Sequence, residues 1–293
     1  MAADGSCLGV CYTENQLFYS VNNPEQDGHL AHIGSIEYNF DVENSIITGR
    51  EPGFPAIQSS LRQIKETHDC SSVKILSPAT KECWTIVPRS VYDDASEREA
   101  HIQLFMNGYD RSDVQVTWHP LSNDESRLLL IRNSSAMKGF RHLMGGFSSS
   151  EYVSEFEIGR EWIRHKANNG SYLMVNCREN HISLSSFILG KLRGCTFIEF
   201  DSYNDLPYFW NLYAGNISWM NGIHDNTCLF GQNCQKIADI LNPYLEDSNS
   251  FQIMNSLSRM DVSANEKTYG FDLERAFPAI IMSLNTGDKS SEL

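Results

Sequence analysis

The sequence has no long hydrophobic run. No stretch approaches the roughly 18 consecutive apolar residues that a membrane-spanning helix needs. The first six residues also lack the basic segment, followed by an apolar one, that marks a signal peptide. We therefore expect a cytoplasmic protein that does not insert into a membrane.

Positive charge is scarce as well. The 293 residues include 23 Lys and Arg against 37 Asp and Glu, which gives a formal net charge of −14. No basic cluster offsets this excess, so a long polyanion would be repelled and nucleic acid is excluded as an expected partner. A hydrophobic content of 41% is that of an ordinary folded chain, and the length suits two domains of about 150 residues each.

Metal-binding motifs are missing too. Of the eight cysteines, Cys7 and Cys11 are near neighbours, as are Cys228 and Cys234, but no C-x-x-C occurs and no His stands at zinc-ligand spacing beside them. Several cysteines interrupt apolar runs, which is typical of buried free thiols. We predict no metal site.

What is present is a pattern of strands and helices that occurs twice. In the first half, strands are predicted over 7–12, 16–21, 32–40 and 73–76, with a helix carrying Ile57, Leu61 and Ile64 before the last of them. In the second half, strands are predicted over 171–176, 181–188, 191–200 and 227–230, with helices over 206–213 and 237–245. Val10 aligns with Val175, an offset too long for a solenoid repeat and suited to two sibling domains.

The middle of the chain is less regular. Strands are predicted over 84–87, 114–118 and 127–131, and helices around residues 93–105 and from residue 134. Gly145 and Gly146 end the second of these helices, and Ser150 is predicted to cap a long amphipathic helix through Trp162. We place a domain boundary at Phe147, giving domains over 1–147 and 148–286 and a frayed tail over 287–293.

This doubled α/β pattern resembles the actin-like ATPase (ribonuclease H-like) fold, and more narrowly an uncharacterised bacterial family, chiefly of Bacteroidetes, with that fold. More distantly it is similar to the pilus-assembly and cell-division actin-like proteins. The resemblance implies two mixed, five-stranded-type sheets flanked by helices, with a central cleft. It rests mainly on the second half, on segments 195–201, 204–210, 229–231 and 241–245.

Members of this superfamily that hydrolyse ATP resemble one another at two phosphate-binding hairpins, each with Asp followed two residues later by Gly, and at a Gly-Gly turn. Asp holds hydrated Mg²⁺, and Gly lets backbone amides approach the phosphates. Here the first hairpin offers only Glu14, and the second has Asn176 at the place of the acid and Arg178 at the place of the glycine. The segment 200–205 has no Gly-Gly pair. An Arg178 side chain would fill the space that a phosphate needs.

Each of the other candidate residues has two possible roles, one functional and one structural. His119 is a general base or a packed histidine. Asp201 and Asp205 bind a cation, or Asp205 caps a helix that has Pro207 in its first turn. Gly145-Gly146 approaches a ligand or only ends a helix. The aromatic set either stacks a ligand or packs in the core; it consists of Tyr203, Tyr208, Phe209, Trp210, Tyr213 and Trp219.

The leading hypothesis is a non-enzymatic, actin-like pseudo-ATPase that binds or scaffolds another protein, with self-association left open. One alternative is a divergent ATPase or kinase-like enzyme that binds ATP and Mg²⁺ through Glu14, Glu179 or Asp201. A second alternative is a small-molecule or peptide binder that uses the interdomain cleft. No catalytic, cofactor-binding or metal-ligating residue is assigned.

Overall fold

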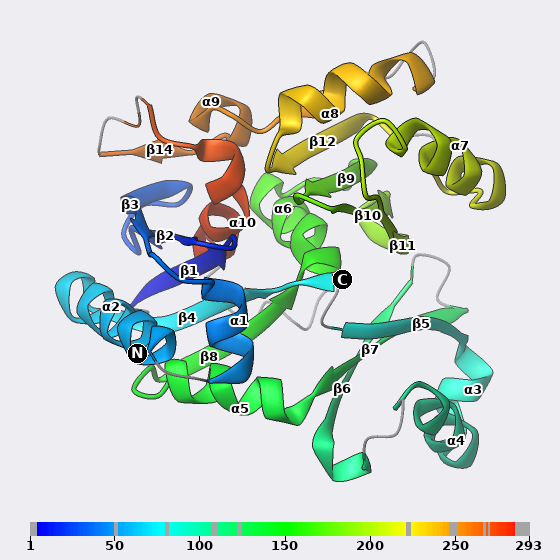
Figure 1. The fold of residues 1–293 in the computed structure, drawn as a ribbon, viewed down its shortest axis with the longest axis horizontal. Helices are drawn as coiled ribbons and strands as arrows, with labels where there is room; N and C mark the ends of the chain where they lie inside the picture. The colour runs from blue at the N-terminus through cyan, green and yellow to red at the C-terminus, as the bar shows by residue number, and fades with distance from the viewer. Residues whose placement is uncertain are drawn as a thin grey trace.

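Three β-sheets organise the part of the chain that the structure describes (Figure 1). The computed structural model describes residues 5–49, 52–79, 82–106, 110–121, 125–220, 224–245, 251–265, 268 and 270–284, so the predicted tail 287–293 lies outside the described residues. Within these ranges no helix is long and apolar enough to cross a membrane.

The first sheet begins with the predicted meander, β1 (Ser6–Tyr12), β2 (Gln16–Asn22) and β3 (His29–Glu37), joined antiparallel. Parallel strands extend it on both sides: β4 (Cys70–Ser77) and β8 (Ser149–Ser154) beside β1, and β14 (Ser263–Ala264) beside β3. The order is β14-β3-β2-β1-β4-β8.

The second sheet repeats this plan. β9 (Tyr172–Cys177), β10 (His181–Ile188) and β11 (Lys191–Glu199) form the antiparallel meander, and β12 (Asn226–Gly231) and β13 (Phe251–Ile253) run parallel to β9. The order β11-β10-β9-β12-β13 matches β3-β2-β1-β4-β8 strand for strand. The predicted duplication of two mixed sheets is therefore confirmed, with β14 as a sixth strand in the first.

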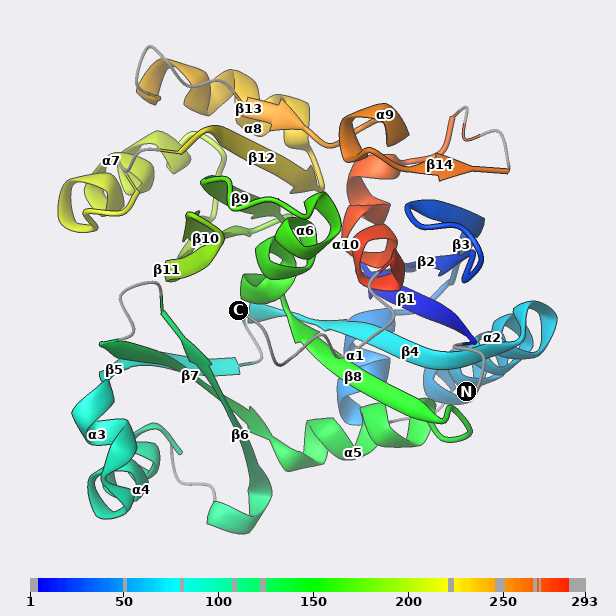
Figure 2. The same cartoon turned by 180° about the vertical axis from the view of Figure 1, so that it is seen from behind.

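Helices cover both faces of the two sheets. The outer face of the first sheet packs against α1 (Val42–Thr48), α2 (Gly53–His68) and α5 (Ser134–Leu143), and that of the second against α7 (Leu206–Asn216) and α8 (Cys234–Leu241). Between the sheets lie α6 (Ile158–Lys166) and α10 (Leu273–Leu284), as both ribbon views show (Figure 2). A short helix, α9 (Leu257–Met260), precedes β14.

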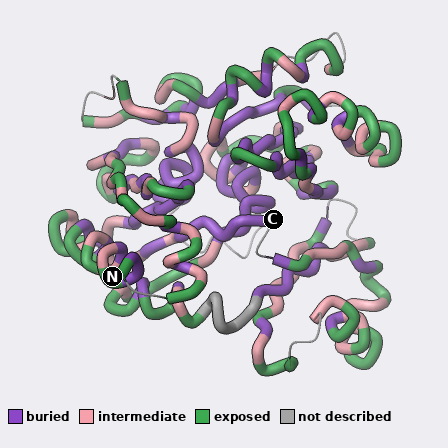
Figure 3. The backbone as a smooth tube through the Cα atoms, viewed as in Figure 1, coloured by how far each residue is buried: buried purple, intermediate pink, exposed green. Residues whose placement is uncertain are grey.

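The side chains of β1 alternate between two cores because successive residues of a strand point to opposite faces. Leu8 and Val10 pack with the outer helices, whereas Cys11 packs inward with α6 and α10. The inner core is the largest and contains residues of both sheets; the buried segments concentrate there (Figure 3). Gly9 allows α10 to lie directly on β1, since a Cβ at Gly9 would stand 2.0 Å from the carbonyl oxygen of Ala279.

The predicted middle strands form a sheet of their own. β5 (Glu82–Pro88), β6 (Val114–Pro120) and β7 (Ser126–Asn133) pair in the order β5-β7-β6, with α3 (Arg89–Asp93) and α4 (Ala95–Phe105) beside them. This unit is inserted between β4 and α5, and in Figure 1 it lies at one corner of the molecule. A small core of its own, around Ile102 and Leu129, holds it together.

The long helix predicted from Ser150 is wrong. Residues 149–154 form strand β8, a 3₁₀ turn follows over Glu155–Glu157, and only then does α6 begin. The cap is Ser154, whose Oγ accepts from the backbone amide of Phe156, while the Glu157 carboxylate accepts from the backbone amide of Ser154. Strand β8 pairs with β4, and β14 and α10 also contact the first sheet, so elements beyond Phe147 belong to it.

Candidate functional site

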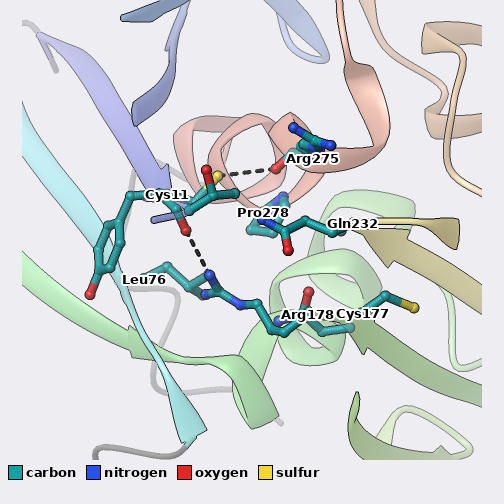
Figure 4. A pocket seen from close by; sticks show the side chains of 11 residues that line it. Cys11, Leu76, Cys177, Arg178, Gln232, Arg275 and Pro278 are labelled. Carbon is teal, nitrogen blue, oxygen red and sulfur yellow. Dashed lines mark hydrogen bonds between the residues drawn. The ribbon is translucent and has the colours of Figure 1, made fainter. Parts of the chain in front are cut away.

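The interdomain cavity lies where the carboxyl ends of four strands, β1, β4, β9 and β12, meet α10 (Figure 4). In α/β sheets, ligands commonly bind beyond the carboxyl ends of the strands. Its volume is about 10 Å³, which is the room that one water molecule needs. It is lined by Cys11, Tyr12, Thr13, Leu76, Asn176, Cys177, Arg178, Gly231, Gln232, Arg275 and Pro278.

Arg178 crosses this cavity and joins the two halves of the protein. Its Nη1 donates to the backbone oxygen of Tyr12 at 2.7 Å, at the first hairpin (Figure 4). Its Nε and Nη2 donate to Oε1 of Glu155 at 2.9 and 2.6 Å. The side chain that the sequence placed at the glycine position is therefore buried between the hairpins and paired there.

Glu155 is the counter-ion of Arg178 and was missed by the sequence analysis. It lies in the 3₁₀ turn between β8 and α6, is 2% exposed, and accepts a further bond from Ser183 Oγ at 3.0 Å. Burial raises the pKa of its carboxyl, but Arg178, His181 and Ser183 outweigh burial and hold the pKa below its ordinary value. The pair is an internally satisfied buried ion pair.

The described residues of this cavity do not fit a magnesium triphosphate. Its lining holds two arginines and no carboxylate, although Mg²⁺ prefers carboxylate and water oxygens. Glu14, Glu179 and Asp201, the acids of the enzymatic alternative, are all exposed and none of them lines the cavity. Asn176 is buried at the position of the missing acid.

The remaining candidate residues occupy structural positions. Asp205 stands at the N-cap of α7 with Pro207 in the first turn, but its side chain makes no capping bond. Among the described residues no cluster of His, Cys, Asp and Glu could hold a metal ion. Helix α5 ends at Leu143, and Gly146 follows with a positive φ of 107°.

The aromatic set packs on the outer face of the second sheet, away from the interdomain cavity. Trp210 is buried, and its ring lies 6.3 Å from that of Phe251. Tyr208 alone of the set is strongly exposed, at 66%. The other members contact the same outer core; they are Tyr203, Phe209, Tyr213 and Trp219. Stacking of a ligand in the interdomain cleft is therefore not available to these rings.

A larger hollow lies between the inserted sheet and the first sheet. Its volume is about 580 Å³, and we call it the edge-strand groove. β6 is the last strand of its sheet in the described chain and β8 the last of the six-stranded sheet, so each has an unpaired edge. It is lined by Val114, Gln115, Thr117, His119, Arg132, Arg141, Ser150, Glu151, Tyr152, Glu157 and Arg160.

Glu157 organises the floor of this groove. Its Oε1 accepts from Arg160 Nη2 at 2.7 Å and lies 3.0 Å from His119 Nε2, while Arg160 Nη1 donates to His119 Nδ1 at 3.1 Å. His119 is therefore packed into an ionic network. Burial raises the pKa of Glu157, but Arg160, His119 and Arg132 together hold it far below its ordinary value.

The same network ties the inserted sheet to the body of the protein. Arg132 of β7 donates to Oε1 of Glu82, and Oε2 of Glu82 accepts from Ser154 Oγ at 2.6 Å. Glu157 and Glu155 thus lie two residues apart on one turn. Glu157 binds the ionic residues of the groove, and Glu155 binds Arg178 at the cavity. The S-x-x-E pattern of Ser154 and Glu157 is a capping-box signature, and this signal could have located the turn in the sequence.

No protein-family model and no curated protein matches the sequence. Solved structures do match. One is a protein of actin-like ATPase fold and unknown function from Bacteroides thetaiotaomicron, at 14% identity, a TM-score of 0.51, and coverage of 88% of this chain and 95% of that one. The chain has the actin-like ATPase fold. The predicted resemblance in fold is thereby confirmed.

Other proteins with this actin-like architecture have been solved in different settings. A chain of the PilM–PilN type IV pilus biogenesis complex matches at 10% identity and a TM-score of 0.61, covering 95% of this chain and 97% of that one. An inorganic polyphosphate/ATP-glucomannokinase from Arthrobacter sp. strain KM matches at 11% identity and a TM-score of 0.50, covering 96% and 97%. The actin-like fold therefore occurs both in an enzyme and in an assembly complex, and it does not decide between these roles.

Proposed function

We propose that this protein is a non-enzymatic, actin-like binding module of the cytoplasm whose partner is another protein. The observation that carries the proposal is the Arg178–Glu155 pair, which bridges both hairpins and leaves room for about one water molecule. Its guanidinium occupies the place where nucleotide phosphates would have to enter. The loss of both Asp-x-Gly hairpins from the sequence supports the same reading.

The partner binds in the edge-strand groove as an extended segment. Ser150, Glu151 and Tyr152 are consecutive residues of β8, and consecutive side chains of a strand point to opposite faces. A hollow that contacts all three therefore touches the edge of the strand, where main-chain groups are free to pair. An added strand is a recurring mode of peptide recognition. The complex of PilM with PilN is a case of a protein of this fold in a protein assembly.

The test is selection of peptides from a randomised display library on the purified protein. Ser150→Trp would fill the groove from its exposed β8 edge, and Asn211→Trp on α7 adds the same side chain to a distant exposed site as a control. We expect peptides selected on the wild type to bind the Ser150→Trp protein about tenfold more weakly or worse, and the control protein unchanged. Selected peptides that bind the Ser150→Trp protein as tightly as the wild type would contradict the proposed site.

A further inference from the structure

The edge-strand groove differs in charge from the rest of the molecule. The chain as a whole carries −14, yet three arginines and one histidine line this groove against two carboxylates. Arg141 is exposed, and the side chain of Arg160 is 32% exposed, so both can meet an incoming group. The groove is thus a locally basic feature on an acidic protein.

Both acids of the groove are already engaged by groups of the protein. Glu157 lies among Arg160, His119 and Arg132, and its second oxygen also caps the Ser154 amide at 3.0 Å. Glu151 faces Lys74 at 3.5 Å. The Glu151 side chain is 46% exposed and can still accept a hydrogen bond, but the three arginines outnumber the two carboxylates, so the groove does not favour a basic ligand.

Several donors of the groove have hydrogen-bonding capacity left over. Arg132 is 3% exposed, and its Nη2 makes no hydrogen bond within the described residues, while Oε2 of Glu157 lies 3.7 Å from it. The Nε of Arg160 and the hydroxyl of Tyr152 are likewise buried without a hydrogen bond among the described residues. Arginine has no acceptor, so only a group that brings acceptor oxygens can satisfy this surplus.

We infer that the edge-strand groove recognises an acidic side chain, Asp or Glu, on the extended segment that it binds. The carboxylate lies between Arg141 and Arg160, which supply charge-assisted hydrogen bonds. The positive charge of the buried Arg132 attracts the same carboxylate. The inference rests on the proposed function, because the segment itself is held by the strand edges. It adds the chemistry by which one segment is chosen over another.

The test is the composition of the peptides selected from the same library. Non-specific attraction to a chain of charge −14 enriches Lys and Arg, so enrichment of acid cannot come from the overall field. We expect Asp and Glu to be enriched about tenfold at one position on the wild type and about twofold or less on the Arg141→Gln/Arg160→Gln protein. A Lys191→Gln/Arg193→Gln protein, which loses the same charge from exposed sites on β11, keeps the enrichment.

Arg141→Gln alone repeats the experiment while keeping the hydrogen bonds of Arg160 to Glu157 and His119, in case the double variant is unstable. One outcome is that the selected peptides lose binding to the Ser150→Trp protein and yet have no enrichment of Asp and Glu, or an enrichment of Lys and Arg. That result would overturn the inference and leave the proposed function standing. Selection that yields no peptide sensitive to Ser150→Trp would overturn both. Acid enrichment that survives in Arg141→Gln and in the double variant would also overturn the inference.

Discussion

Replacing Arg178 with methionine is expected to lower the free energy of unfolding by about 3–5 kcal/mol, because the buried Glu155 carboxylate loses its counter-ion. The 2% exposure of Glu155 leaves water little access to compensate. Tyr12 also loses the donor to its backbone oxygen. Urea unfolding followed by circular dichroism measures the loss.

The matched control adds Glu155→Gln to the same chain. Removing the stranded charge is expected to recover at least half of the lost stability, since the cost lies mainly in an uncompensated buried ion. A loss below about 1 kcal/mol for Arg178→Met would contradict the description of a buried, paired site, because an exposed ion pair contributes no more than that.

Replacing Trp162 with alanine is expected to cost about 3–5 kcal/mol, the usual range for deleting a large buried aromatic side chain. Trp162 of α6 is 2% exposed, and its ring lies 5.7 Å from that of Phe277 in α10 and 6.3 Å from that of Tyr172 in β9. It stands in the inner core that both sheets share. The loss should therefore be felt in both halves of the protein.

Hydrogen exchange of backbone amides can separate the two halves. We expect the protection of β1 and of β9 to fall by the same factor in Trp162→Ala, and by less in Trp162→Phe, which keeps an aromatic ring in place. If β9 alone lost protection, the two sheets would have independent cores, contrary to the shared core described above.

Local patterns in the sequence predicted most of the strands. The meanders over 7–40 and 171–200 are short alternating runs joined by short loops, and both are present, although the third strand of the first lies at His29–Glu37 and not at 32–40. The order of elements in the two halves then gave the duplication. These features are local, so periodicity and turn residues were sufficient to predict them.

Contacts between distant residues were not predictable in this way. Strand β14 pairs with β3 through Ser263 and His29, and no local pattern links two such distant segments. Strand β8 was mistaken for helix because its first residues are exposed and polar, while Val153 and Phe156 stand at a helical spacing. The buried partner of Arg178 was hidden for the same reason, since Glu155 follows directly on β8.

The sequence predicted some of the residues that line the interdomain cavity. Asn176 and Arg178 were placed at the second hairpin from sequence alone, and the structure puts both in the cavity lining. The edge-strand groove was not predicted at all, because it arises from the packing of the inserted sheet against β8. Its ionic residues come from five separate elements and from the turn after β8, and no spacing in the sequence brings them together.

Titration calorimetry with Mg-ATP, together with an assay for released phosphate, tests the central claim most directly. With the cleft closed by Arg178 and Glu155, we predict no binding heat up to about 1 mM nucleotide and no phosphate release. Micromolar binding accompanied by phosphate release would contradict the account.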